Sequence, residues 1–515
     1  MRITKWIGST LFIIGILIGG LTYAQSPGGT LRVAVQGEPL GLNLILTPSA
    51  ETYQLIMYNV VEPLLRYTAE GELTPLLATS YEVEELEGGT RYTFYLRSGV
   101  TFQNGEPFTA HDVKYTFDRL LDPAIASPNA APFSFLRGIE ILNNLTVRFV
   151  TEGKAAPFLG YLASNKGAGI IPAGSDMEVL KTHPIGTGPF AFVEWVPGDH
   201  LTLMKNPHYW KEESPYLDEV IVKFIPDQAA SLAALRAGDV DMVDKMVSEN
   251  ALVLESDPRF KVIADWMNTP QLLAINNARP PFDNLLVRRA LCYAIDRDEI
   301  IAGTVARPEW GRPIGSHMSP RNPLFYVDLV GMYPHDPERA RRLLAQAGYP
   351  DGFQTTIYLP QPFEFHIRTG EIIADQLREV GIDCSLQVLE WGQWIERVYR
   401  QWDYDLTVIG DDQGVEPAAN FTKPFERVQA DGSSKYYFQY SNPFVRELLS
   451  RGKETFDTAE RKTIYAMVQT IIASDAMAVW IQDIPHFEGM RSEVMGYRKL
   501  PIYVLDLARL YMSDG

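Results

Sequence analysis

The sequence predicts an α/β fold, because helical and strand patterns alternate along its 515 residues. One helical pattern, residues 371–380, gives way across Gly381 to residues 382–388, whose apolar side chains alternate as in a strand. A helix over 391–401 and a strand over 405–409 repeat this order, as crossover units of a largely parallel sheet require. Apolar residues make up 46% and charged residues 21%, which excludes a disordered or fibrous chain.

The first expected elements lie in the N-terminal third of the chain. Residues 30–35 are typical of a strand, and residues 91–97 alternate with a period of two, as a half-buried strand does. Thr109 is a candidate N-cap for the helix that follows. The apolar face of this helix comprises Val113, Phe117, Leu120 and Leu121.

Capping residues and glycines predict two further helices. Asp227 can cap a helix over 228–237, with Gly238 as its left-handed stop. Asp336 and Pro337 open a second helix that runs through residue 347 and ends at Gly348. Together with the helix–strand units described above, these patterns lead us to interpret residues 273–477 as one α/β lobe.

The N-terminus has the pattern of a cleaved secretory signal. Arg2 and Lys5 precede an apolar run over 6–21, and small residues at Thr22 and Ala24 come just before Gln25. The alternative is a membrane anchor, for which the run is short of the ~20 residues that a bilayer requires. We predict a signal peptide over residues 1–24 and a periplasmic mature protein.

The charge balance excludes one class of partner. Lys and Arg total 46 against 64 Asp and Glu, a formal net charge of −18, and removal of Arg2 and Lys5 makes it −18 − 2 = −20. Such an acidic protein repels phosphate backbones and anionic membranes. We therefore expect no nucleic-acid partner.

The two cysteines, Cys292 and Cys384, lie in apolar patterns and are predicted to be buried free thiols, although an exported protein permits a disulfide.

Motifs of catalysis are not found. The chain has no Gly-x-Ser-x-Gly elbow, no phosphate loop ending in Gly-Lys-Ser/Thr and no His-Glu-x-x-His, and its eight histidines show no ligand spacing. The glycine-rich residues 186–189 are interpreted as a tight crossing turn. We expect no catalytic residue, no metal and no cofactor. A hydrolase without a short signature stays open as the alternative from another class.

Aromatic residues are abundant, with 9 Trp, 25 Tyr and 24 Phe. Most of them belong in the core, but Phe363, Trp391 and Trp394 lie at predicted loop or helix-start positions. Aromatic walls with a few polar anchors suit a deep pocket for a mid-sized ligand.

Six blocks of the sequence, in order, carry a specific resemblance. The chain resembles a family 5 solute-binding protein of bacterial ABC importers, the group that includes dipeptide-, oligopeptide- and nickel-binding proteins. The blocks cover nearly the whole chain after the signal: residues 92–113, 184–190 (PIGTGPF), 206–210 (NPHYW), 234–241 (ALRAGDVD), 287–297 and 343–353.

The resemblance implies a two-lobed periplasmic-binding-protein fold, type II-like, of the large cluster with an extra subdomain inserted in lobe I. It also implies a receptor that closes on its ligand without making or breaking a bond, docks on a membrane permease and acts as a monomer. Mapped on this chain, lobe I comprises residues 25–55, 186–272 and 478–515, the inserted subdomain residues 56–185, and lobe II residues 273–477.

The resemblance also implies which residues meet the ligand. Peptide-binding members use an Asp in a Gly-Asp loop for the ligand's ammonium group, which matches Asp411 first and Asp412 second. The dipeptide branch has an Arg before a Pro where this chain has Gln361, and Gln cannot form a charged fork with a carboxylate. A peptide of variable length is therefore one reading. The other is an oligosaccharide stacked on Phe363, Trp391 or Trp394, and nickel is the least expected ligand because no His lies in residues 405–440.

Overall fold

The computed structural model describes residues 28–513, apart from residues 165, 362, 427–428, 430–431 and 433. The predicted signal peptide, residues 1–24, lies outside the described residues. Within the described part of the chain, no helix combines the length and the apolar character that a membrane crossing needs.

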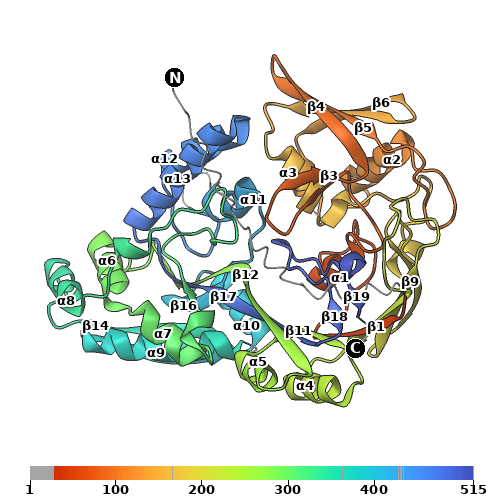
Figure 1. Ribbon diagram of the computed structural model, residues 1–515. Coiled ribbons are helices and arrows are strands. Elements are labelled where there is room, and N and C mark those ends of the chain that lie inside the picture. Colours follow the sequence, from red (N-terminus) through yellow and green to blue (C-terminus); the bar gives the residue numbers. More distant parts are fainter. Residues whose placement is uncertain are drawn as a thin grey trace, which may run out of the picture.

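One large mixed sheet runs through the molecule, and the predicted α/β fold is confirmed (Figure 1). Its parallel pairs are β14 with β15 and β16 at one end, and β1 with β10 and β11 at the other. The strands in order are β15 (Ile382–Leu389), β14 (Phe353–Pro360), β16 (Leu406–Gly410), β12 (Phe260–Ile275), β17 (Ala478–Arg491), β11 (Met242–Met246), β1 (Thr30–Val35), β10 (Glu219–Phe224), β9 (His200–Lys205) and β8 (Phe190–Val196), with β13 (Arg312–Pro313) beside β17.

Two long antiparallel strands, β12 and β17, join the two ends of this sheet. The C-terminal part of β12 pairs with β16, whereas the C-terminal part of β17 pairs with β11. Their mutual register shifts between Trp266 and Pro270, where Asn268 has a left-handed backbone with φ 60°. The chain therefore passes between the two halves of the molecule through a pair of strands with an irregularity in the middle.

A second, four-stranded antiparallel sheet belongs to the N-terminal region, drawn in orange in Figure 1. Its strand β5 confirms the alternating pattern predicted over 91–97, and Thr109 caps α2 in a capping box with Asp112. The order is β4 (Ala78–Leu86), β5 (Gly89–Leu96), β7 (Thr146–Glu152) and β6 (Leu136–Asn143); two small sheets pair β2 (Leu65–Tyr67) with β3 (Leu73–Pro75) and β18 (Val494–Met495) with β19 (Tyr511–Met512).

The helices follow the predicted caps closely. Asp227 caps α4, which ends at the left-handed Gly238, and Asp336 caps α8 with Pro337 at its first position. The α-helices are α1 (Ala50–Ile56), α2 (Ala110–Leu121), α3 (Phe158–Ser164), α4 (Gln228–Ala237), α5 (Ser248–Glu255), α6 (Leu285–Ala294), α7 (Arg297–Thr304), α8 (Pro337–Gln346), α9 (Glu364–Glu379), α10 (Trp391–Trp394), α11 (Pro417–Phe421), α12 (Pro443–Glu454) and α13 (Thr458–Ser474).

Two of these helices differ from the expected ranges. Helix α9 begins seven residues before the predicted 371. The prediction started late because residues 364–370 lack the apolar periodicity that marks the rest of the helix. The helix predicted over 391–401 is one α-helical turn, α10, continued by a wider π-helical segment, η6 (Ile395–Arg400). The remaining short helical turns are η1 (Ala131–Phe133), η2 (Lys166–Ala168), η3 (Val179–Lys181), η4 (Pro308–Trp310), η5 (Val330–Met332), η7 (Thr422–Glu426) and η8 (Leu507–Arg509).

Both faces of the sheet are covered where β12 enters the C-terminal half. Leu272 and Ala274 pack into one apolar cluster, while the alternating Leu273 and Ile275 pack into another on the opposite face. The two cysteines are free and buried, as predicted, and burial raises the pKa of each thiol to about 12.

The glycine-rich residues 186–189 form a close crossing of two chain segments. A Cβ atom on Gly186 would lie 2.2 Å from the carbonyl oxygen of Val60, so only glycine permits this approach. Between the two glycines, the Thr187 hydroxyl donates to Glu62 Oε2 at 2.8 Å. Tyr209 and Trp210 also donate to the Glu62 carboxylate, at 3.0 Å each. Two of the blocks noted in the sequence thus converge on one buried carboxylate.

Candidate ligand-binding cleft

A cleft of about 1050 Å³ lies where the two halves of the molecule face each other. Three groups of elements line it: the N-terminal half with α4 and the end of β11, the strands β12 and β17, and the C-terminal half with α9, α10, η6 and the end of β16. Lining residues are Gln36, Gln228, Lys245–Val247, Thr269, Phe363–His366, Trp391, Trp394, Ile395, Tyr399, Arg400, Ile409–Asp412, Tyr436, Tyr437 and Ile484–His486. A solute held here contacts both halves at once.

Two adjacent carboxylates enter this cleft from the loop after β16. The backbone N–H of Asp411 donates to the carbonyl oxygen of Pro270 at 3.0 Å, which fixes the loop against β12. The side chain of Asp411 is 20% exposed, and that of Asp412 accepts from the Thr269 hydroxyl at 2.9 Å. Gly410 lets side chains pack closely before them, because a Cβ there would lie 2.7 Å from Ile484 Cδ1.

The histidines beside this loop are neutral at physiological pH. His317 Nε2 lies 3.6 Å from Asp411 Oδ2, but complete burial lowers the pKa of this imidazole to about 4. Burial likewise lowers the pKa of His366, which lines the cleft, to about 4. Neither imidazole therefore offsets the negative charge of the Asp411–Asp412 pair, which suits a cationic group of a ligand.

An aromatic wall stands next to the carboxylates. Trp391 and Trp394 stack with ring centroids 5.2 Å apart and planes 8° apart, and Phe363 meets Trp391 edge-on at 5.2 Å. Phe363 is 40% exposed and Trp391 36%, whereas Trp394 is 2% exposed and donates its indole N–H to Thr407 at 3.0 Å. The open ring surfaces thus belong to Phe363 and Trp391, and Trp394 supports them from behind.

Gln361 does not join this group. It is exposed, its backbone N–H donates to the carbonyl oxygen of Leu389 at 2.8 Å, and it is not part of the cleft lining. The structure accordingly brings five of the six residues predicted to bind ligand to one cleft: Asp411, Asp412, Phe363, Trp391 and Trp394.

Lys245 is a cleft residue that the sequence pattern did not single out. It lies in β11 with a left-handed backbone, φ 59°, and its ammonium group donates to the Tyr503 hydroxyl. Burial lowers the pKa of Lys245, against the charges of Asp244, Asp412 and Glu51, which raise it. The sequence feature that could have pointed to Lys245 is a lysine inside an otherwise apolar and acidic strand, residues 242–246 (MVDKM).

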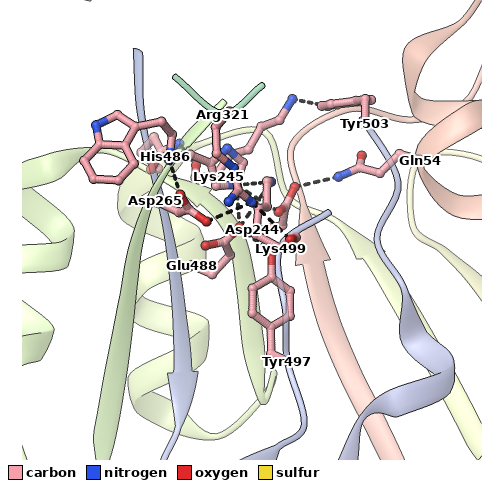
Figure 2. A network of polar contacts seen from close by, with 12 residues as sticks. Gln54, Asp244, Lys245, Asp265, Arg321, His486, Glu488, Tyr497, Lys499 and Tyr503 are labelled. Atoms are coloured by element: carbon pink, nitrogen blue, oxygen red, sulfur yellow. Dashed lines mark hydrogen bonds and ion pairs between the residues drawn. The ribbon is translucent and has the colours of Figure 1, made fainter. Parts of the chain in front are cut away.

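A buried ionic network adjoins Lys245 at the end of the cleft (Figure 2). Asp244 accepts from Gln54 Nε2 at 2.6 Å and lies 3.3 Å from His486 Nε2, which in turn lies 2.8 Å from Glu488 Oε1. Lys499 Nζ lies 3.2 Å from Glu488 Oε1. Burial would raise the pKa of Asp244, but the hydrogen bond and charge of His486, with the charges of Lys499 and Lys245, outweigh burial and hold that pKa well below its usual range.

The same network contains the one described group of side chains whose spacing suits a metal ion. The ligand atoms of Asp244, His486 and Glu488 all lie within 4.8 Å of one another. The ammonium group of Lys499 lies beside Glu488, so a cation of the protein itself already stands in this cluster.

Comparisons with known proteins agree on the family. The profile of the bacterial extracellular solute-binding proteins, family 5, matches residues 72–433. Heme-binding protein A of Haemophilus influenzae is 27% identical, with 93% of this chain and 91% of that protein covered. Di/tripeptide-binding protein 2 of Pseudomonas aeruginosa is also 27% identical, with 95% of this chain and 96% of that protein covered.

A solved structure gives the same answer for the fold. The periplasmic binding protein DppA of Helicobacter pylori, in complex with the peptide STSA, superposes with a TM-score of 0.77 at 27% identity, covering 95% of this chain and 99% of that one. The two-lobed architecture implied by the sequence blocks is therefore confirmed. The chain belongs to family 5 of the bacterial extracellular solute-binding proteins.

Proposed function

We propose that this protein captures a peptide in the cleft and delivers it to the membrane permease of an ABC importer. The observation that carries the proposal is the pair of adjacent carboxylates, Asp411 and Asp412, placed in a cleft that both halves line. A carboxylate in such a cleft forms a strong, charge-assisted bond with a peptide's terminal ammonium. The names of two relatives, a di/tripeptide-binding protein and a structure with a bound peptide, support this ligand class.

The division into lobes explains how capture would be coupled to delivery. We propose lobe I as residues 25–55, 186–272 and 478–515, a subdomain as 56–185, and lobe II as 273–477. In support, one apolar cluster joins residues 31–224 to residues 490–510, and two others draw on residues 272–481. Strands β12 and β17 then act as the hinge, and a solute that touches both lobes stabilises the closed state.

Native mass spectrometry of protein purified from its own host tests the ligand class directly. We expect a co-purified mass that fragments into amino acids. A hexose series would instead favour an oligosaccharide, the second candidate, which the exposed faces of Phe363 and Trp391 would stack against. In that case Trp391→Ala should abolish binding and a change at Asp411 should not.

Substitution of Asp411 tests the ammonium contact. Asp411→Ala should weaken the binding of an unblocked peptide by ~2–5 kcal/mol, because it leaves the buried ammonium without its charged partner. Calorimetry with the peptide that mass spectrometry identifies measures this loss. The matched control is Asp351→Ala, which removes an exposed carboxylate outside the cleft. Unchanged affinity in Asp411→Ala would refute the assignment of Asp411.

Two further parts of the proposal concern activity and export. We propose that the protein leaves its ligand chemically intact, so incubation with short peptides should yield no hydrolysis products by liquid chromatography.

We also propose an exported periplasmic monomer that has lost residues 1–24. N-terminal sequencing of the mature protein should then begin at Gln25, and light scattering should give the mass of one chain.

A further inference from the structure

We propose that Lys245 is a second ligand anchor, whose ammonium group binds a carboxylate of the bound peptide from lobe I, opposite the Asp411–Asp412 pair of lobe II. This inference rests on the proposed function, because it assigns a role to a further residue of the same cleft. Nothing in the sequence blocks marks Lys245; its position in the cleft and its charge environment do.

The backbone holds Lys245 in an unusual and fixed conformation. A left-handed φ of 59° is uncommon for a residue with a side chain, and it coincides with a register shift between Val243 and Met246 opposite β17. Gln228 braces this bend from both sides: its Nε2 donates to the carbonyl oxygen of Lys245 at 2.8 Å, and its Oε1 accepts from the N–H of Val247 at 3.1 Å. Strained backbone supported in this way is typical of functional sites.

The bend separates two neighbouring charges. Asp244 is 2% exposed and lies in the network with His486, whereas Lys245 lines the cleft and extends toward Tyr503 (Figure 2). The Lys245 ammonium lies 4.0 Å from the centre of the Tyr503 ring and donates to its hydroxyl. Both contacts orient the ammonium group, and neither brings a negative charge to it.

The charge of Lys245 is uncompensated at contact distance. Among the described residues, no carboxylate oxygen lies within 4.0 Å of its Nζ; Asp244, Asp412 and Glu51 act on it only at longer range. The guanidinium of Arg400, which also lines the cleft, is paired with Glu396 at 3.2 Å. A half-buried cation without an ion pair is costly, and a ligand carboxylate is the group that would pair with it.

The cleft is therefore electrically polarised across the hinge. Lys245 supplies positive charge from lobe I, and Asp411 and Asp412 supply negative charge from lobe II. A zwitterionic ligand that lies between them satisfies both, and each of its charges contacts a different lobe. Such a ligand gains most of its electrostatic stabilisation only in the closed state, which couples charge recognition to closure.

The carboxylate can come from two sources, the C-terminus of the peptide or an acidic side chain. Three sets of random tetrapeptides without internal Asp or Glu separate them: free acids, C-terminal amides, and amides that end in glutamate. Each set is titrated against four proteins, and the thermal shift gives the apparent affinities. The proteins are wild type, Lys245→Met, Lys245→Arg and the control Lys205→Met. Lys205 is an exposed lysine outside the cleft.

We expect wild type and Lys205→Met to bind the free acids about 10–100-fold more tightly than the plain amides, as a charge-assisted hydrogen bond predicts. Lys245→Met should bind the acids and amides alike, and Lys245→Arg should recover part of the preference. Tighter binding of the glutamate-ending amides by wild type than by Lys245→Met would assign the contact to a side chain instead of the C-terminus.

The same preference for acids in Lys245→Met as in wild type would overturn the role of Lys245 and leave the proposed function standing. Absence of any peptide binding by wild type would overturn the proposed function, and this inference with it. N-terminal acetylation of the free acids adds an independent check, because it should weaken binding to wild type and to Lys245→Met by the same factor.

Discussion

Glu62 offers the sharpest test of the electrostatics of this fold. Its carboxylate is 1% exposed and accepts hydrogen bonds from Thr187, Tyr209 and Trp210, and no cation forms an ion pair with it among the described residues. Burial raises its pKa from 4.5 to about 7, although the three hydrogen bonds and the charge of Arg66 lower it. The native state therefore takes up a proton here at a pH where the unfolded chain has lost it.

This pKa difference sets the sign and size of the effect on stability. Because the native state holds the proton more tightly, the contribution of Glu62 is fully present below the unfolded pKa of 4.5 and is lost as pH rises through about 7. The loss on full ionisation is about 3 kcal/mol in the free energy of unfolding. Between about pH 5 and about pH 8, the free energy of unfolding of wild type should fall by roughly 2–3 kcal/mol through the ionisation of Glu62.

Glu62→Gln removes the titration while keeping the shape. The amide oxygen can accept from Thr187 and Trp210, and one amide N–H can donate to the Tyr209 hydroxyl oxygen, so each of the three neighbours keeps a hydrogen bond to residue 62. Urea unfolding of wild type and variant is followed by tryptophan fluorescence across this pH range. As pH rises, the free energy of unfolding of the variant should increase by roughly 2–3 kcal/mol relative to that of wild type.

The matched control for this series is Glu87→Gln, which replaces an exposed carboxylate in the turn between β4 and β5. Its stability relative to wild type should stay constant with pH. The reasoning would be refuted if the free energies of unfolding of Glu62→Gln and wild type differed by the same amount from acid to alkaline pH. Glu62 would then have the same pKa in the folded and unfolded chain.

Three further predictions concern other charged and buried groups. Glu416→Gln should lower the free energy of unfolding by ~3–5 kcal/mol, because it leaves the buried guanidinium of Arg461 without the carboxylate that lies 2.6 Å away; equal urea midpoints would contradict this. Arg368→Ala breaks an exposed ion pair between α9 and Glu249 of α5, at 2.9 Å, and should change peptide affinity in calorimetry by ~1 kcal/mol or less, so a larger loss would point to direct ligand contact. Neither thiol should react with Ellman's reagent in the native protein, since both are buried with pKa values of about 12, and both should react in concentrated guanidinium; rapid native labelling would contradict their burial.

Local signals predicted most of the secondary structure. The caps at Thr109, Asp227 and Asp336 each open the helix expected of them, because a cap depends only on the backbone of the next turn. The start of α9 was missed, since the residues before 371 lack the apolar periodicity that marks a buried face. Likewise the π-helical segment after Trp394 leaves no simple trace in the sequence.

The candidate site was predicted only in part. The Gly-Asp loop and the aromatic residues could be placed through the resemblance, and five of the six named residues line the cleft. Lys245 was missed because its importance depends on a bend in β11 and on Tyr503, which lies 258 residues further along the chain. Gln361 follows β14 directly in sequence, yet its backbone bonds to Leu389 at the end of the neighbouring strand β15, and the residue falls outside the cleft.

The sequence by itself determined the class of this protein, its helices and strands and the family to which it belongs, because periodicity, caps and ordered motifs are properties of neighbouring residues. Only the tertiary structure decided which polar groups face one another: Glu62 with Thr187 and Asp244 with His486 are pairs 125 and 242 residues apart. Strand order and the hinge pair β12–β17 bring such residues together, and the burial that follows sets their pKa values and their interaction energies.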